Sequence, residues 1–120
     1  MNVEVNFDSI GGGDISIDDL DITGKTLLHT ISSTGQSYTT TEDCVISGTL
    51  GGASGTSSGR IYASTDGGTT KSVMFWVAHN GSAAIGGGDG IFKYGVFVPK
   101  GTTIITENYG TYSINFYSLH

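Results

Sequence analysis

The side chains best suited to binding a sugar lie near the C-terminal end of the 120-residue sequence. Tyr109 and Tyr112 flank Gly110, and Asn108 precedes them. Apolar sugar faces stack on aromatic rings, while sugar hydroxyls need amide or hydroxyl partners, so Asn108, Tyr109 and Tyr112 form a candidate ligand-binding set. The alternative is that each tyrosine ends a strand and bonds its hydroxyl to the backbone.

Residues for catalysis or for a structural metal are sparse. The single cysteine and the scattered histidines show no Glu-x-x-His or paired-cysteine spacing, whereas a zinc site needs three or four converging ligands. No Gly-x-Ser-x-Gly elbow is present, and only three acidic residues follow residue 43, too few to favour a carboxylate pair. We therefore predict no enzymatic activity and no cofactor. The histidines are His29, His79 and His120.

An acidic cluster in the N-terminal third offers oxygen ligands for a hard cation. Asp14, Asp18, Asp19 and Asp21 lie within one short stretch, and calcium takes several oxygens from one loop. Their spacing does not match a calcium loop with a closing glutamate. A solvated acidic turn and a calcium or magnesium site both remain open.

The charge balance narrows the classes of partner. The net charge is −6, from 11 acidic and five basic residues. Nucleic-acid affinity rests on neutralising phosphates, so we predict no nucleic-acid partner. No apolar run approaches the roughly 18 residues of a membrane span, and no basic segment followed by an apolar one opens the sequence, so we expect neither membrane insertion nor a signal peptide.

Cys44, between acidic and aliphatic neighbours, is predicted to be a buried thiol in a strand, with a reactive thiol as the alternative.

Two stretches that would position a site are apolar on both faces. Lys71 to Ser82 holds the only tryptophan, and Ile91 to Val98 is similar in pattern. Side chains alternate along a strand, and a sandwich strand usually keeps one face in water. A second subunit would cover the other face, which places Trp76 in a core or an interface. A β-bulge or barrel closure that buries both faces within one subunit is the alternative. The candidate interface residues are Met74, Trp76, Phe92 and Phe97.

The rest of the chain reads as short strands joined by tight turns. The sequence contains 20 glycines and only 13% charged residues, which disfavours helices. Asp66-Gly67-Gly68 and Asn80-Gly81 each predict a hairpin, and Pro99-Lys100-Gly101 predicts a turn. We expect one domain over 1–120, with 1–36 a candidate attachment or accessory strand region. The predicted strands are Asn2–Phe7, Ile15–Ile17, Lys25–Ile31, Ser37–Thr40, Cys44–Leu50, Arg60–Ala63, Lys71–His79, Ile91–Val98, Thr102–Thr106 and Thr111–Leu119.

Two segments resemble a known kind of domain. Ser37 to Gly52, a strand, threonines, an acidic turn and an aliphatic strand, and Tyr94 to Leu119, YGVFVPKGTTIITENYGTYSINFYSL, resemble small jelly-roll-like head domains of bacteriophage fibres. Those domains are similar in build to the tumour-necrosis-factor-like trimers. The resemblance implies an all-β, antiparallel, jelly-roll-like β-sandwich that forms a homotrimer. It also implies a place on the virion surface and adhesion to a cell-surface glycan or protein.

Two other roles fit the same sequence. A monomeric carbohydrate-binding module working beside a glycoside hydrolase would bind sugar through exposed aromatic residues. A small capsid decoration protein would bind no ligand. Oligomeric state and glycan binding separate these roles from the trimeric adhesion protein.

Overall fold

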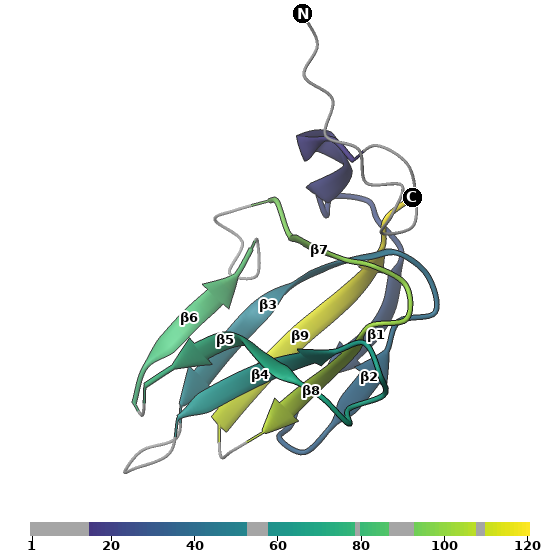
Figure 1. The fold of residues 1–120 in the computed structure, drawn as a ribbon. Coiled ribbons are helices and arrows are strands. Elements are labelled where there is room, and N and C mark those ends of the chain that lie inside the picture. Colours follow the sequence, from purple (N-terminus) through teal and green to yellow (C-terminus); the bar gives the residue numbers. More distant parts are fainter. Residues whose placement is uncertain (1–14, 53–57, 79, 87–92, 108–109) are drawn as a thin grey trace, which may run out of the picture.

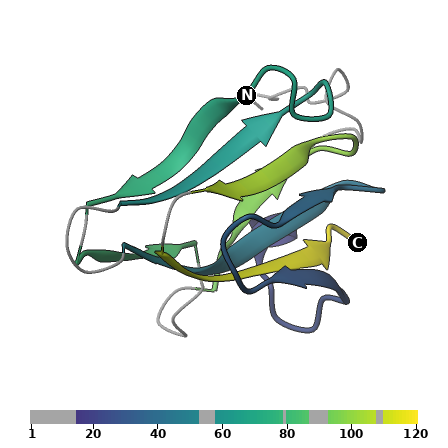
Figure 2. The same cartoon turned by 90° about the horizontal axis from the view of Figure 1, so that it is seen from below.

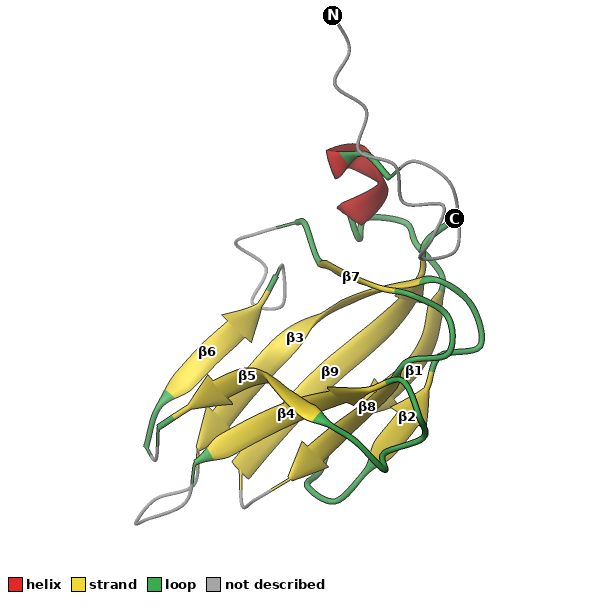
Figure 3. Cartoon of the chain, in the orientation of Figure 1, coloured by secondary structure: helices red, strands yellow, loops and turns green. Residues whose placement is uncertain are grey.

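The computed structural model describes residues 15–52, 58–78, 80–86, 93–107 and 110–120 (Figure 1). These residues form nine strands and one short 3-10 helix, η2 (Ile17–Leu20) (Figure 3). The all-β, antiparallel sandwich expected from the sequence is confirmed. The strands are β1 (Leu27–Ile31), β2 (Ser37–Thr39), β3 (Cys44–Gly52), β4 (Gly59–Ser64), β5 (Ser72–Val77), β6 (Ser82–Ile85), β7 (Val96–Val98), β8 (Thr103–Glu107) and β9 (Gly110–Ser118).

The strands form two sheets that pack face to face (Figure 2). The five-stranded sheet has the order β1-β9-β3-β6, and β7 pairs with β3 alongside β6. The four-stranded sheet has the order β2-β8-β4-β5. Every pairing is antiparallel, and most connections carry the chain from one sheet to the other.

The longest pairing joins β3 to β9 in the middle of the five-stranded sheet. It runs without a break from Cys44 opposite Ser118 to Gly52 opposite Gly110. At its centre Gly48 lies so close to β9 that an added Cβ would collide with the carbonyl oxygen of Ser113. Glycine therefore permits the close approach of the two central strands.

The core is built from the inward side chains of both sheets. Phe116 of β9 is fully buried, and its ring meets Tyr38 of β2 edge to face at 4.8 Å between centroids. Apolar burial of this kind is the main term that holds two sheets together. The fully buried or nearly buried core residues are Ile31, Ile46, Leu50, Ile61, Val77, Ile85, Val98, Ile104, Tyr112, Ile114 and Phe116.

Of the three turn predictions, two are confirmed and one is wrong. Asp66-Gly67-Gly68 joins β4 and β5, which pair with each other, so this hairpin is confirmed. Pro99-Lys100-Gly101 is also a turn, with Gly101 at φ 84°. The Asn80-Gly81 hairpin is wrong, because β5 and β6 lie in different sheets. Asn80 has φ 61°, so the local conformation that Asn-Gly favours is present, but it serves a crossing between sheets.

Two strand predictions are corrected by the structure, and a third lies outside the described residues. Ile15–Ile17 is not a strand, because η2 begins at Ile17 and the Asp19 carboxylate accepts the Ser16 N–H at 2.9 Å, a bond typical of a helix start. In the described part of Ile91–Val98, residues 93–98, the strand covers only Val96–Val98, while Tyr94 makes an isolated bridge to Asp21. Asn2–Phe7 lies outside the described residues.

The N-terminal third contributes to the sandwich. β1 pairs with β9 and forms one edge of the five-stranded sheet, so Leu27–Ile31, within the predicted region 1–36, is an edge strand of the sandwich. The attachment prediction for 1–14 falls outside the described residues. In the part of the chain that is described, no helix has the length and apolar character needed to cross a membrane.

The prediction of a buried Cys44 is confirmed. Its side chain is inaccessible to solvent, and Sγ donates to the carbonyl oxygen of Glu42 at 3.2 Å. Burial, together with the charges of Glu42 and Asp43, raises the pKa of the thiol to about 11. A thiol that stays protonated at neutral pH is a poor nucleophile, so the structure favours a packing role.

Strand β5 shows why the doubly apolar pattern misleads. Ile61 pairs with Phe75 and Tyr62 pairs with Val73, so Met74 is an extra residue in a β-bulge. Met74 and Phe75 both pack against the core, while Val73 is exposed. Trp76 is 56% exposed, so the core within one subunit is excluded for it, and a place in an interface stays a prediction. The bulge is present, but it does not bury both faces of the strand within one subunit, because Val73 and Trp76 remain exposed.

Truncating two aromatic side chains should therefore have opposite consequences. Phe116→Ala removes a fully buried ring and should lower the free energy of unfolding by about 3–5 kcal/mol. Trp76→Ala should cost less than about 1 kcal/mol, because most of its ring is already in water. Urea unfolding followed by circular dichroism measures both. A larger loss for Trp76→Ala than for Phe116→Ala would contradict this assignment of the core.

Candidate ligand-binding face

The outer face of the four-stranded sheet carries the side chains best placed to bind a ligand. Ile61 points into the core, so its neighbours Arg60 and Tyr62 point outward. Residues that pair directly across antiparallel strands share a face. Two rows of outward residues follow from the register: Trp76, Arg60 and Glu107 in one, and Val73, Tyr62 and Ile105 in the other.

The bulge in β5 brings two exposed apolar side chains to this face. In an unbroken strand Val73 and Trp76 would point to opposite sides, since they are three residues apart. The extra residue Met74 restores them to the same side. Val73 is 50% exposed and Trp76 is 56% exposed, and both are on the edge strand of the sheet.

Charged side chains border the aromatic ones. Lys71 forms an ion pair with Glu107, and its ammonium lies 4.8 Å from the centroid of the Tyr62 ring. An ion pair this exposed adds little to stability, but it fixes where the two charges lie. Lys71 also occupies one face of Tyr62, which leaves Trp76 as the aromatic surface most open to a ligand.

The backbone under the face is held by Tyr112 from the opposite sheet. Its hydroxyl accepts the N–H of Arg60 at 3.1 Å and donates to the carbonyl oxygen of Glu107 at 2.5 Å; the carbonyl oxygen of Arg60 is at 3.2 Å. Tyr112 is only 5% exposed. The predicted ligand-binding role of Tyr112 is therefore wrong, and the alternative of a hydroxyl bonded to backbone holds. Asn108 and Tyr109 lie outside the described residues.

The predicted interface residues that lie in the described part of the chain do not share one sheet face. Met74 packs partly against the core, and Trp76 is exposed on the four-stranded sheet. Phe97 is half-buried on β7, which belongs to the five-stranded sheet. Phe92 lies outside the described residues. The pattern that grouped Met74, Trp76 and Phe97 reflected hydrophobicity and not location.

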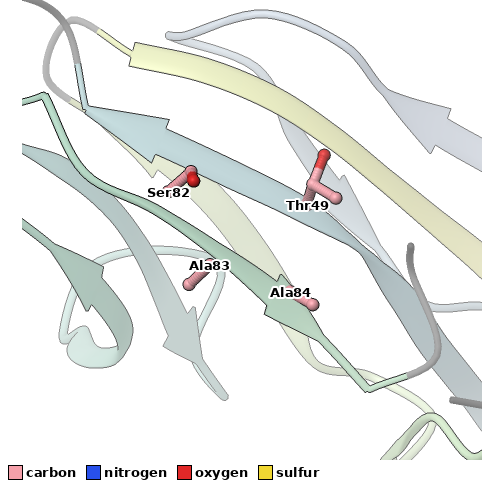
Figure 4. A pocket seen from close by; sticks show the side chains of 4 residues that line it. All are labelled: Thr49, Ser82, Ala83 and Ala84. Carbon is pink, nitrogen blue, oxygen red and sulfur yellow. The ribbon is translucent and has the colours of Figure 1, made fainter. Parts of the chain in front are cut away.

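A second candidate location is a shallow depression of about 260 Å³ at the β6 edge of the five-stranded sheet. Thr49, Ser82, Ala83 and Ala84 line it, and Figure 4 shows their short side chains along β3 and β6. These residues offer two hydroxyl groups and no ring or charge. The depression therefore offers fewer groups that could bind a ligand than the face around Trp76 does.

The acidic cluster is engaged locally. Asp19 caps η2, and the Asp21 carboxylate accepts the Thr23 N–H at 2.9 Å and lies 3.4 Å from the Lys93 ammonium. The hydrogen bonds from Thr23 and the nearby Lys93 lower the pKa of Asp21. Asp14 lies outside the described residues, and within those residues no group of three potential metal ligands converges.

Comparison with known proteins adds no further identification. No protein-family model matches the chain, and searches of curated proteins and of solved structures gave no match.

Removing the Tyr112 hydroxyl should weaken the fold. Tyr112→Phe leaves the Arg60 N–H and the Glu107 carbonyl without that partner inside the sandwich, so we expect a loss of about 1–3 kcal/mol in the free energy of unfolding. Tyr117→Phe, in the same strand, is the matched control, because its hydroxyl makes no hydrogen bond among the described residues. Chemical unfolding measures both variants. Equal stability of Tyr112→Phe and the unmodified protein would rule out the role of this hydroxyl.

Proposed function

We propose that this chain is a non-enzymatic adhesion protein that binds a cell-surface glycan through the outer face of the β2-β8-β4-β5 sheet. The observation that carries the proposal is the exposed indole of Trp76, in a row with Arg60 and Glu107. A flat aromatic ring bordered by hydrogen-bonding and charged groups has the two features that sugar recognition needs, a stacking surface and polar partners.

The size of the apolar surface sets the strength expected of one site. Covering the exposed half of a tryptophan removes roughly 100 Å² of surface from water, which contributes about 2.5 kcal/mol. That is less than the 4.1 kcal/mol that corresponds to a dissociation constant of about 1 mM, so a single site built on Trp76 alone binds weakly. Adhesion through such a site requires several copies acting together, because linked sites multiply affinity.

A need for several copies supports the finer proposal of a jelly-roll homotrimer on a phage virion or tail fibre. The strand orders β1-β9-β3-β6 and β2-β8-β4-β5, with the chain passing repeatedly between sheets, favour a jelly roll over an up-and-down sandwich. This agrees with the resemblance of Ser37 to Gly52 and Tyr94 to Leu119 to phage head domains. Display at the virion surface would bring three weak sites to one cell surface.

The exposed Trp76 also favours the second candidate, a monomeric carbohydrate-binding module. Both roles use the same face, and they differ in the number of copies that act together. The capsid decoration role makes no use of an exposed tryptophan, so the observed face favours it least.

Glycan binding should depend on Trp76. On an array of bacterial and host glycans, the labelled protein should bind a subset of glycans, and Trp76→Ala should lose that binding by at least about tenfold, since stacking is its main apolar contact. Leu27→Ala is the matched control, because Leu27 is similarly exposed but lies on β1 of the other sheet. Equal losses in the two variants, or no binding by the unmodified protein, would contradict the proposed site.

The assembly is measured separately. Light scattering coupled to size-exclusion chromatography at low micromolar concentration should give about three times the chain mass of 12.4 kDa. A mass of one chain would contradict the trimer and move the carbohydrate-binding module to first place.

A further inference from the structure

Arg60 occupies the centre of the proposed binding face. It pairs with Trp76 on one side and with Glu107 on the other. Its backbone N–H is held by the hydroxyl of Tyr112, so its Cα is fixed relative to both sheets. The rest of the face is arranged around this residue, whose positive charge is not used by stacking on Trp76.

The positive charge of Arg60 lacks an anionic partner among the described residues. Glu107, the carboxylate directly across from it, pairs with Lys71. Asp66, in the β4–β5 turn, accepts bonds from Ser64 Oγ at 2.7 Å and the Thr70 N–H at 2.8 Å. The face therefore holds two cations, Arg60 and Lys71, and one carboxylate, within a chain whose net charge is −6.

The guanidinium is also poorly hydrogen-bonded. Its Nη1 donates to the neutral hydroxyl of Tyr62 at a long 3.4 Å. Within the described part of the chain, Nε is buried and has no hydrogen-bond partner. A charged group that is partly removed from water without a counter-ion raises the free energy of the unbound state, and an anion supplied from outside would lower it.

The spacing of the two residues suits one sugar unit. Side chains that pair directly across antiparallel strands start about 4.5–5.5 Å apart, a distance comparable to the width of a sugar ring. A ring stacked on the indole of Trp76 would thus place an exocyclic group beside Arg60. Arginine binds carboxylates with two parallel N–H bonds and has no acceptor, so the group it selects is an anion.

We infer that the ligand of this face is an acidic glycan, and that Arg60 binds the carboxylate of a sugar whose ring stacks on Trp76. The inference rests on the proposed glycan-binding function and specifies its ligand class. Distant acidic residues oppose it only weakly, because charges more than about 8 Å away are largely screened at physiological ionic strength.

The test compares acidic oligosaccharides with their methyl esters, which keep the ring and remove the charge. Galacturonate, glucuronate and sialic-acid-bearing oligosaccharides, each paired with its ester, are titrated into the full chain. Because Trp76 is the only tryptophan, its indole N–H gives a single, unambiguous NMR signal for binding. We expect at least one acid to bind about tenfold or more tightly than its ester, as loss of a charge-assisted bond implies.

The variants separate the two levels of the proposal. Arg60→Gln should bring the ratio of the ester and acid dissociation constants close to one, and Arg60→Lys should restore part of that ratio, since lysine keeps the charge without the planar fork. Circular dichroism confirms that each variant is folded. Binding of neutral sugars or esters at Trp76 with no preference for the acid, or a preference that survives Arg60→Gln, would overturn the inference and leave the proposed function standing. No response of the indole signal to any saccharide would overturn both.

Discussion

The hydroxyl of Tyr112 is the contact on which the candidate binding face depends. The Tyr112 side chain extends from β9 in the five-stranded sheet. Its hydroxyl hydrogen-bonds to the backbone of Arg60 in β4 and of Glu107 in β8, both in the four-stranded sheet. Buried polar groups are almost always hydrogen-bonded, so this single oxygen constrains three strands at once. Apolar contacts between sheets are non-directional, whereas a hydrogen bond requires a defined geometry. The Tyr112 bonds therefore fix the backbone of β4 and β8 at the point where their outer surface carries charged side chains.

The β-bulge at Met74 determines what that surface contains. By placing one residue out of step, it turns Met74 toward the core and leaves Val73 and Trp76 on the same exposed side. Bulges commonly change the direction of side chains at sheet edges. Here Met74 and Phe75 of the edge strand pack against the core, while Val73 and Trp76 face solvent. Trp76 is part of a strand and not of a loop. Binding to a rigid element loses less conformational entropy than binding to a loop, so the position of Trp76 favours ligand affinity.

The sequence predicts much of this scaffold, because strand signals are local. Alternation and turn chemistry located β3, β8 and β9, and Asp66-Gly67-Gly68 identified the hairpin that joins β4 to β5. Asn80-Gly81 failed because the same backbone conformation serves a hairpin or a crossing between sheets. The core alternative for Trp76 failed because hydrophobicity alone does not separate a buried side chain from an exposed one, and a bulge cannot be read from hydrophobic alternation, which assumes an unbroken strand. Arg60 and Glu107 are 47 positions apart in the sequence and meet only through the register of β4 and β8, so no short motif marks them.

The proposed binding face requires Trp76 to be open to ligands in the protein as it assembles in solution. The most direct measurement is acrylamide quenching of its fluorescence, across concentrations below and above any oligomer transition, with the chemically unfolded chain as the reference. We expect solvent-exposed emission in the native state and quenching about half as efficient as in the unfolded chain, in agreement with the 56% exposure of the side chain. Native emission that resists quenching and becomes accessible only on unfolding would contradict it. The tryptophan would then be covered by the fold or by a neighbouring subunit.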